Sequence, residues 1–169
     1  MNKEDIQTLF AYNTWANQRI MDAAAKVPAE QYAAPSHLSH GGLRATLTHL
    51  IGVEILWYQR MRESVSPTVI LKENEAPAFD DLHKLWLDES KAWDAYIASL
   101  SDADFLAVKH YQNMEGAPKA EPLWQVLAHV VNHGTQTRSE AGVALTDYNC
   151  SPGDLDFIMF VRERQPGLR

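Results

Sequence analysis

Three histidines in apolar helical patterns are the residues of this sequence best suited to chemistry. His129 and His133 are four residues apart in a segment that reads as a helix, so both imidazoles project from one face. His49 lies inside a second apolar helical run. Paired histidines on one helix and a third on a facing helix can make a metal site with open coordination positions. The pattern therefore predicts a metal site with His49, His129 and His133 as candidate ligands.

The site predicted in this way is incomplete. Thr137, one helical turn beyond His133, occupies the position where a further ligand is expected, and a neutral hydroxyl is a poor ligand beside imidazole. Neutral imidazole suits zinc, nickel, copper or iron(II), and we expect zinc or nickel, bound weakly or not at all. The alternative is that the histidines are core residues, hydrogen-bonded to neighbouring carbonyl or hydroxyl groups.

The other polar candidates have structural interpretations. The remaining histidines lie in loop or polar segments and are expected to be solvated, although the loop that carries His40 can approach the mouth of a bundle. Residues 12–17 combine aromatic and amide side chains, which suit either packing and capping or the lining of a pocket. Glu54 and Glu140 are interpreted as members of surface ion pairs, or else as partners that orient a histidine. No catalytic residue is assigned, because the sequence shows neither a nucleophile with its base nor a phosphate-binding loop.

The elements that would position these residues are helical. Apolar residues recur every three or four positions in four segments, which predicts helices over 3–26, 43–64, 79–99 and 121–146. Residues 101–104 indicate a turn or the start of a further helix, and residues 105–119 predict a short extended hairpin. Ser151 opens a last short helix. The fold class is all-α: a single domain, 1–169, forming a four-helix bundle. Loops of about fifteen residues are longer than an up-and-down bundle needs, so we expect a long crossover connection.

Composition excludes several classes of function. The chain has 169 residues and a net charge of −7, with no basic stripe, so nucleic acid is not an expected partner. No apolar run approaches the ~18 residues of a membrane span, and the N-terminus lacks the apolar core of a signal peptide. Cys150 is the only cysteine, which fits a reducing compartment. We therefore expect a cytoplasmic protein with no membrane partner.

Three stretches of the chain, taken in order, resemble the DinB-like family of metalloenzymes, also called the DinB/YfiT-like family. They are residues 9–17 (LFAYNTWAN), 43–51 (LRATLTHLI) and 127–135 (LAHVVNHGT), with Arg138 following. The resemblance covers nearly the whole chain. It implies a four-helix bundle with one long crossover, often a homodimer, and a divalent metal held by three histidines. Two of those positions match His49 and His133.

The third ligand position of the family matches Thr137, where histidine is usual. His129 also resembles a family-typical residue, which usually lies beside the site. Relatives of known activity transfer or isomerise with low-molecular-weight thiols, or are hydrolases. The first hypothesis is therefore a divalent-metal-dependent hydrolase or thiol-dependent transferase that acts on a small molecule. The alternative is a degenerate, metal-free member that binds a small molecule or only forms a structural homodimer.

Overall fold

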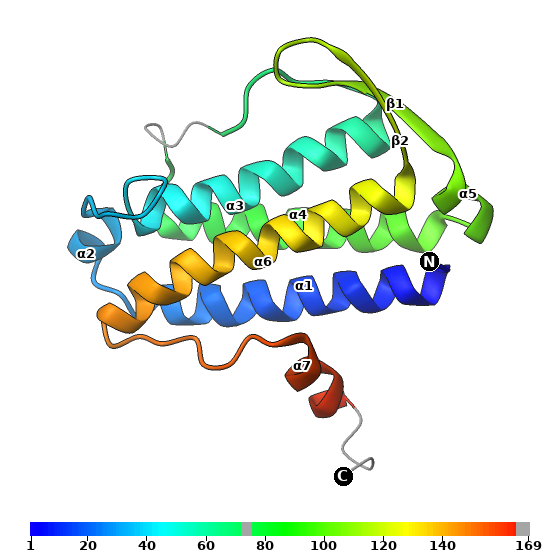
Figure 1. Cartoon of the computed structure of the whole chain (residues 1–169). Helices are drawn as coiled ribbons and strands as arrows, with labels where there is room; N and C mark the ends of the chain where they lie inside the picture. The colour runs from blue at the N-terminus through cyan, green and yellow to red at the C-terminus, as the bar shows by residue number, and fades with distance from the viewer. Residues whose placement is uncertain (72–75, 165–169) are drawn as a thin grey trace.

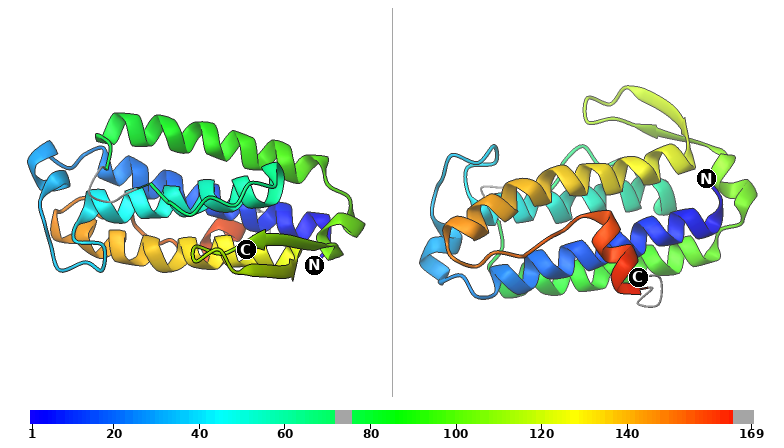
Figure 2. Two further views of the ribbon diagram at one scale, coloured as in Figure 1. Left: turned by 90° about the horizontal axis from the view of Figure 1, so that it is seen from above. Right: turned by 60° about the horizontal axis from the view of Figure 1, so that its bottom comes forward.

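Four long helices form a bundle, as the sequence predicts (Figure 1). The computed structural model describes residues 1–71 and 76–164. Helices α1 and α6 run in one direction, and α3 and α4 run in the other (Figures 1 and 2). Helix α1 packs on α6, and α3 packs on α4. These two pairs face each other through contacts between α1 and α4 and between α3 and α6. The bounds are α1 Lys3–Ala24, α3 Leu43–Tyr58, α4 Phe79–Ser99 and α6 Leu123–Asp147.

Local signals fix where these helices begin and end. Asn2 caps α1 by accepting a hydrogen bond from the backbone N–H of Asp5, whose carboxylate accepts one from the Asn2 backbone in return. Proline 28 lies beyond the end of α1, as expected of a residue that cannot continue a helix. Pro122 immediately precedes α6, where the missing N–H costs nothing. The bounds of α4 are those that the periodicity predicts.

The connection between α3 and α4 is the long crossover. Because α3 and α4 run in the same direction, the chain must return along the bundle before α4 begins (Figure 1). The predicted helix 43–64 is in fact an α-helix followed by one π-helical turn, η1 (Gln59–Glu63), which stops at Ser64 with a positive φ of 56°. Gly52 makes room for the return, since a Cβ there would be 2.7 Å from Ile70 Cγ2.

Two short helices lie between the long ones, and only the second begins at a predicted position. Helix α2 (Ala29–Ala33) lies in the segment that the sequence describes as a loop, and it buries one large side chain, Tyr32. Helix α5 (Asp102–Leu106) begins where the sequence predicts a turn or a helical start, and it extends over the first two residues of the predicted hairpin. A capping box between Ser101 and Asp104 starts this helix, which explains why the strands begin later.

The hairpin and the last helix are shifted from their predicted bounds. Strands β1 (Val108–Gln112) and β2 (Pro118–Pro122) pair antiparallel above the start of α6 (Figure 1). Helix α7 (Phe157–Arg164) begins six residues after Ser151 rather than at it. Pro152 and Gly153, which has a φ of +75°, keep the intervening chain out of helical conformation.

The core consists of two apolar clusters, one towards each end of the bundle. The first includes Phe10, Trp93 and Leu127, and the second includes Ile20, Leu47 and Trp86. The buried polar side chains of α1, α3 and α6 include Asn13, Asn17, Glu54 and Arg138. Within the described residues, no helix is both long enough and apolar enough to cross a membrane.

Candidate metal centre

His49 and His133 meet across the contact between α3 and α6. Their Nε2 atoms are 3.2 Å apart and partly buried, and the two ring centroids are 5.2 Å apart. The meeting follows from the fold, because α3 and α6 are adjacent antiparallel helices and each places its histidine near mid-length. The sequence alone suggests that these side chains could share a site, and the structure brings them together.

Two further imidazoles adjoin this pair, one from a loop and one from α6. The ring of His40 stacks on His49, with centroids 3.9 Å apart and an interplanar angle of 22°. The ring of His129 is 6.0 Å from that of His133 and packs edge-on against Trp57 at 5.3 Å. His40 is therefore nearer to the pair than its loop position predicts, and His129 lies to one side of it.

Thr137 does not take the place of a ligand in this arrangement. Its side chain is buried, and its hydroxyl donates to the backbone carbonyl of His133 at 3.1 Å. The Glu140 carboxylate, one turn further along α6, accepts a hydrogen bond from the hydroxyl of Ser39. Glu140 thus connects α6 to the loop that carries His40, and the surface ion pair expected for it is not found among residues 1–71 and 76–164.

The environment of His133 keeps its ring neutral. Burial is the main reason that its pKa falls to about 4, and the neighbouring imidazoles of His49, His129 and His40 and the Arg138 guanidinium lower it further. A neutral imidazole keeps a lone pair on one ring nitrogen, which is the form that binds a metal. His133 is therefore ready to act as a ligand throughout the neutral range of pH.

The separation of the two imidazoles matches the metal that the resemblance implies. Two imidazole nitrogens on one zinc ion, each at about 2.0–2.1 Å in tetrahedral geometry, are separated by roughly 3.3 Å. The observed 3.2 Å between His49 Nε2 and His133 Nε2 fits that separation, so the pair fits as half of a site. Within residues 1–71 and 76–164, no three His, Cys, Asp or Glu side chains converge as a metal-binding group.

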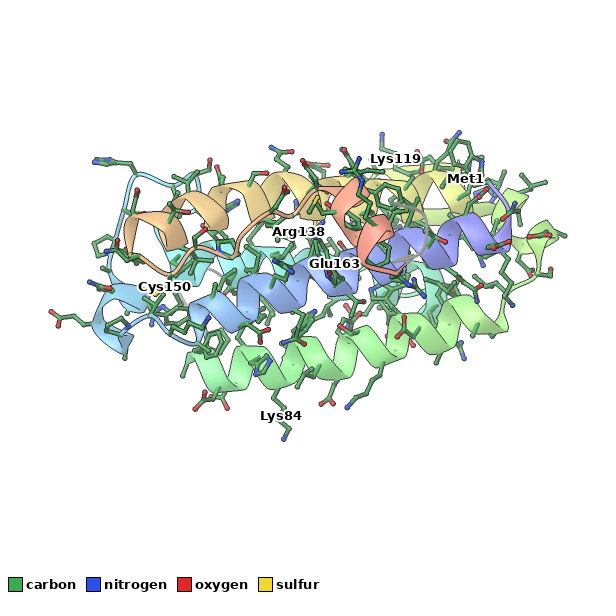
Figure 3. The ribbon with its side chains drawn as sticks, turned by 90° about the horizontal axis from the view of Figure 1, so that it is seen from below. Met1, Lys84, Lys119, Arg138, Cys150 and Glu163 are labelled. Atoms are coloured by element: carbon green, nitrogen blue, oxygen red, sulfur yellow. The ribbon has the colours of Figure 1, made fainter. Side chains whose placement is uncertain are left out.

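A buried polar network lies beside the histidine pair and joins three helices. The Glu54 carboxylate of α3 accepts hydrogen bonds from Asn13 Nδ2 at 2.7 Å and Asn17 Nδ2 at 3.0 Å. Arg138 of α6 donates through Nη1 to the amide oxygens of the same two residues, at 2.6 and 2.8 Å. Figure 3 shows Arg138 between α6 and α1. The asparagine amides therefore bridge a buried anion and a buried cation.

Glu54 is buried in this network, so its interpretation as a member of a surface ion pair is wrong. Its side chain is only 3% exposed and Arg138 only 1%. Burial raises the pKa of Glu54, whereas the two amide hydrogen bonds and the Arg138 charge lower it. Gly134 explains how Arg138 fits, because a Cβ at this position would be 2.7 Å from Arg138 Nη1 and 2.8 Å from Asn13 Oδ1. Glycine at position 134, next to His133, therefore leaves room for the hydrogen bond between Arg138 and Asn13.

A third carboxylate, Glu89 of α4, gives a prediction for the dependence of stability on pH. Burial and the negative charges of Glu54 and Glu63 raise its pKa from 4.5 to about 7, and its buried Oε1 has no hydrogen-bond partner among the described residues. Since the folded state holds this proton more tightly than the unfolded state, the stability contribution is full below about pH 4.5 and is lost as pH rises through 7. Glu89→Gln should therefore raise the free energy of unfolding at pH 8 by about 1–2 kcal/mol.

Urea unfolding of the wild type and the variant at pH 5 and pH 8 measures this effect. The gain should be much smaller at pH 5, where most folded molecules carry the proton. Glu30→Gln, an exposed change on α2, serves as the control and should leave the difference between the two pH values unchanged. An equal gain for Glu89→Gln at both pH values would contradict the raised pKa.

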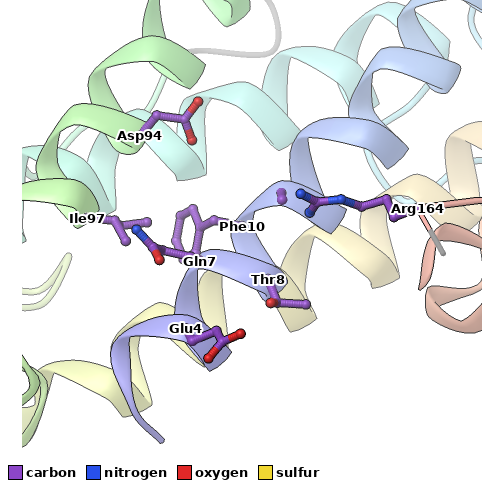
Figure 4. Close-up of a pocket in the computed structure, with 8 residues that line it drawn as sticks. Glu4, Gln7, Thr8, Phe10, Asp94, Ile97 and Arg164 are labelled. Carbon is purple, nitrogen blue, oxygen red and sulfur yellow. The ribbon is translucent and has the colours of Figure 1, made fainter.

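A separate hollow lies away from the histidines. It has a volume of about 450 Å³ and opens between α1, α4 and the end of α7 (Figure 4). Its lining includes Glu4, Gln7, Asp94 and Arg164, and burial raises the pKa of Asp94. No histidine lines this hollow, so it is distinct from the candidate metal centre.

Comparison with known proteins agrees with the resemblance. The family model described as "DinB family" matches residues 1–165. The chain is 28% identical over 167 residues to "Protein DinB" of Bacillus subtilis (strain 168), an alignment that covers 93% of this chain and 95% of that protein. No solved structure matches the chain significantly. With a family model that spans almost its whole length and a bundle of four long helices, this chain belongs to the DinB family.

Proposed function

We propose that the protein is a divalent-metal-dependent enzyme that acts on a small molecule, with His49 and His133 as its metal ligands. The observation that carries the proposal is the 3.2 Å separation of their Nε2 atoms, which is the distance that two imidazoles on one ion require. Zinc or nickel suits this donor set, because imidazole nitrogen favours these ions over magnesium or calcium. A bound ion would supply Lewis acidity to a substrate oxygen or to a coordinated water or thiol.

The chain's own residues prepare the site in three ways. Packing against His40 and the helix contact hold the His49 ring, and burial keeps His133 unprotonated. Thr137 leaves one side of the pair without a strong protein donor, which leaves coordination positions for a substrate. His129, which is exposed beside His133, is the proposed further contact to the ion or to a bound molecule. Hydrolysis or thiol-dependent transfer is the reaction class that the family resemblance implies.

One observation favours a second candidate, a metal-free binding or structural protein. A separation of 3.2 Å also suits a hydrogen bond between one protonated and one unprotonated imidazole nitrogen, and this bond would satisfy both rings without a metal. In that case the histidines are core residues. Thr137 then marks a position at which this chain has lost a metal ligand together with the metal. The homodimer and the cytoplasmic location stay predictions under either function.

Calorimetric titration of the untagged protein with zinc separates the two candidates. The metal-dependent function predicts one saturable site for each chain, and His49→Ala and His133→Ala should each weaken binding by at least about 100-fold. His110→Ala on strand β1 is the matched control and should bind as the wild type does. If zinc binding is absent from the wild type, or survives in both site variants, the metal-free function is correct.

A further inference from the structure

A hollow of about 360 Å³ opens beside α2, at the end of the bundle where α1 ends and α3 and α4 begin (Figure 1). Most of its lining is apolar and comes from the end of α1, from α2 and from the start of α4. The apolar side chains include Ala24, Val27, Ala33 and Phe79. A hollow of this size and character, here called the α2 hollow, can hold a small organic molecule.

Two polar side chains in the lining lack a protein partner. Tyr32 is only 5% exposed, and its buried hydroxyl has no hydrogen-bond partner among the described residues. Arg44, in the first turn of α3, makes no ion pair or side-chain hydrogen bond within residues 1–71 and 76–164. Burial raises the pKa of Tyr32 to about 12, and the charge of Arg44 is close enough to oppose that rise. The Tyr32 hydroxyl therefore keeps its proton and remains a donor at neutral pH.

We propose that the α2 hollow binds a small carboxylic acid with an apolar body, whose carboxylate accepts hydrogen bonds from Arg44 and from the Tyr32 hydroxyl. The planar guanidinium group matches the two oxygens of a carboxylate. A carboxylate oxygen also satisfies the Tyr32 hydroxyl, whose burial without a partner otherwise costs stability. The inference goes beyond the proposed function, because this site requires no metal.

Charge and polarity favour a carboxylate over an inorganic anion. Arg44 is the one cation and Asp80 the one acid found in the described lining of the α2 hollow. Asp80 is exposed at the start of α4, so solvent screens its charge, but a second negative charge on the ligand would still be repelled. The apolar walls stabilise a ligand only if it brings an apolar body with it. A monocarboxylate with a short hydrocarbon body meets both conditions.

The start of α3 adds to the positive potential at Arg44. The first turn of this helix has neither a capping side chain nor an acidic residue, so its N–H groups and dipole favour an anion nearby. A neighbouring hollow of about 370 Å³ shares Ala33 and Arg44 with the α2 hollow and is also lined by His40. Because the ring of His40 stacks on His49, the carboxylate is held on the side of the α2 hollow that adjoins the histidine pair.

Titration of the untagged full chain with hexanoate, followed by NMR in the presence of EDTA, tests the proposal. Saturable shifts are expected at the backbone amides of Ala33 and Arg44. Arg44→Gln should weaken hexanoate binding by at least about tenfold, and Tyr32→Phe by about threefold, as expected for a charged and a neutral hydrogen bond. Arg62→Gln is the matched control, since it removes the same charge from an exposed position in η1, and it should bind as the wild type does.

A change that fills the hollow separates ligand binding from an effect on the fold. Ala33→Leu places a larger side chain at an exposed position of the lining and leaves both donors in place, so it should weaken hexanoate binding by at least about tenfold. Ala103→Leu, an exposed change on α5, should have no effect. Hexanol, which lacks the charge, and acetate, which lacks the body, should each bind the wild type at least about tenfold more weakly than hexanoate. Urea unfolding checks that each variant is folded.

The inference and the proposed function can fail separately. Hexanoate that gives no saturable shifts, or that binds Arg44→Gln as tightly as the wild type, overturns the α2 site, whatever zinc does at His49 and His133. Shifts confined to the hollow between α1, α4 and α7 overturn it as well. Inorganic phosphate that binds as tightly as hexanoate would show that an apolar body is not recognised, and the carboxylic acid assignment would then be wrong.

Discussion

Arg138→Leu is expected to lower the free energy of unfolding by about 3–5 kcal/mol, the typical cost of leaving a buried charge without the opposite charge that compensates it. The change removes the only cation in the network and leaves Glu54, 3% exposed, as a buried anion held by two amides. It also leaves the amide oxygens of Asn13 and Asn17 without the donor that they share. Thermal unfolding should show the loss as a fall in Tm of roughly 6–20 °C.

Arg19→Leu provides a matched control for this prediction. Arg19 pairs with Glu163 at 3.4 Å on the surface, where both side chains are at least 36% exposed, so its loss should cost under about 1 kcal/mol. A double variant, Glu54→Leu with Arg138→Leu, should recover part of the stability, because no buried charge is then left unpaired. If Arg138→Leu were no more destabilising than Arg19→Leu, the network would not be a stabilising element of the bundle.

Thr137→His should strengthen zinc binding by at least about tenfold, because it adds an imidazole to a site that otherwise has a weak hydroxyl at that position. Thr137 lies one turn beyond His133 on the same face of α6, and its hydroxyl now serves only the backbone carbonyl of His133. Calorimetric titration of untagged wild type and variant measures the gain directly.

Val143→His is the control for this second prediction. Val143 is 59% exposed on the same helix, so a histidine there adds an imidazole to the chain without adding one to the site. Since position 137 is buried, a larger side chain could cost about 1–3 kcal/mol of stability, and unfolding curves of each variant identify that effect separately. Equal zinc affinity for Thr137→His, Val143→His and the wild type would show that position 137 does not adjoin a metal centre.

The parts of the fold that sequence could predict depend on local periodicity. The apolar positions of 79–99 give the bounds of α4 without error, and those of the other three helices give their existence and approximate ends. The same periodicity places His49 and His133 each within a buried stretch, which is why their meeting could be anticipated. Helix α2 was not predicted, because it has only five residues and follows a proline. So short a segment shows too little periodicity to distinguish a helical turn from a loop.

The buried network could not be predicted, because its partners come from three helices. Asn13 and Asn17 read equally well as capping or pocket residues until the register of α1 against α3 and α6 is known. Glu54 looked like a surface acid for the same reason, since its partners are distant in the chain. One signal was present: amides four residues apart on one face of a helix, together with an acid and an arginine inside apolar helices, indicate a shared polar layer.

His40 shows a different limit of prediction from sequence. Its loop has no periodicity, and the hydrogen bonds that fix it involve Glu140, a hundred residues further along the chain. Only the three-dimensional packing places its ring on His49. A histidine in a loop bounded by proline and glycine is in most proteins a solvated residue, so residue type and spacing alone could not single it out.

The most direct test of the central claim is the anomalous diffraction signal of zinc in crystals of the untagged protein. The account predicts one strong peak for each chain, bonded at about 2.0–2.1 Å to the Nε2 atoms of both His49 and His133. Crystals grown in saturating zinc that show no peak between these two nitrogens, with the rings still in direct contact, would contradict it. The histidines would then be core residues joined by a hydrogen bond.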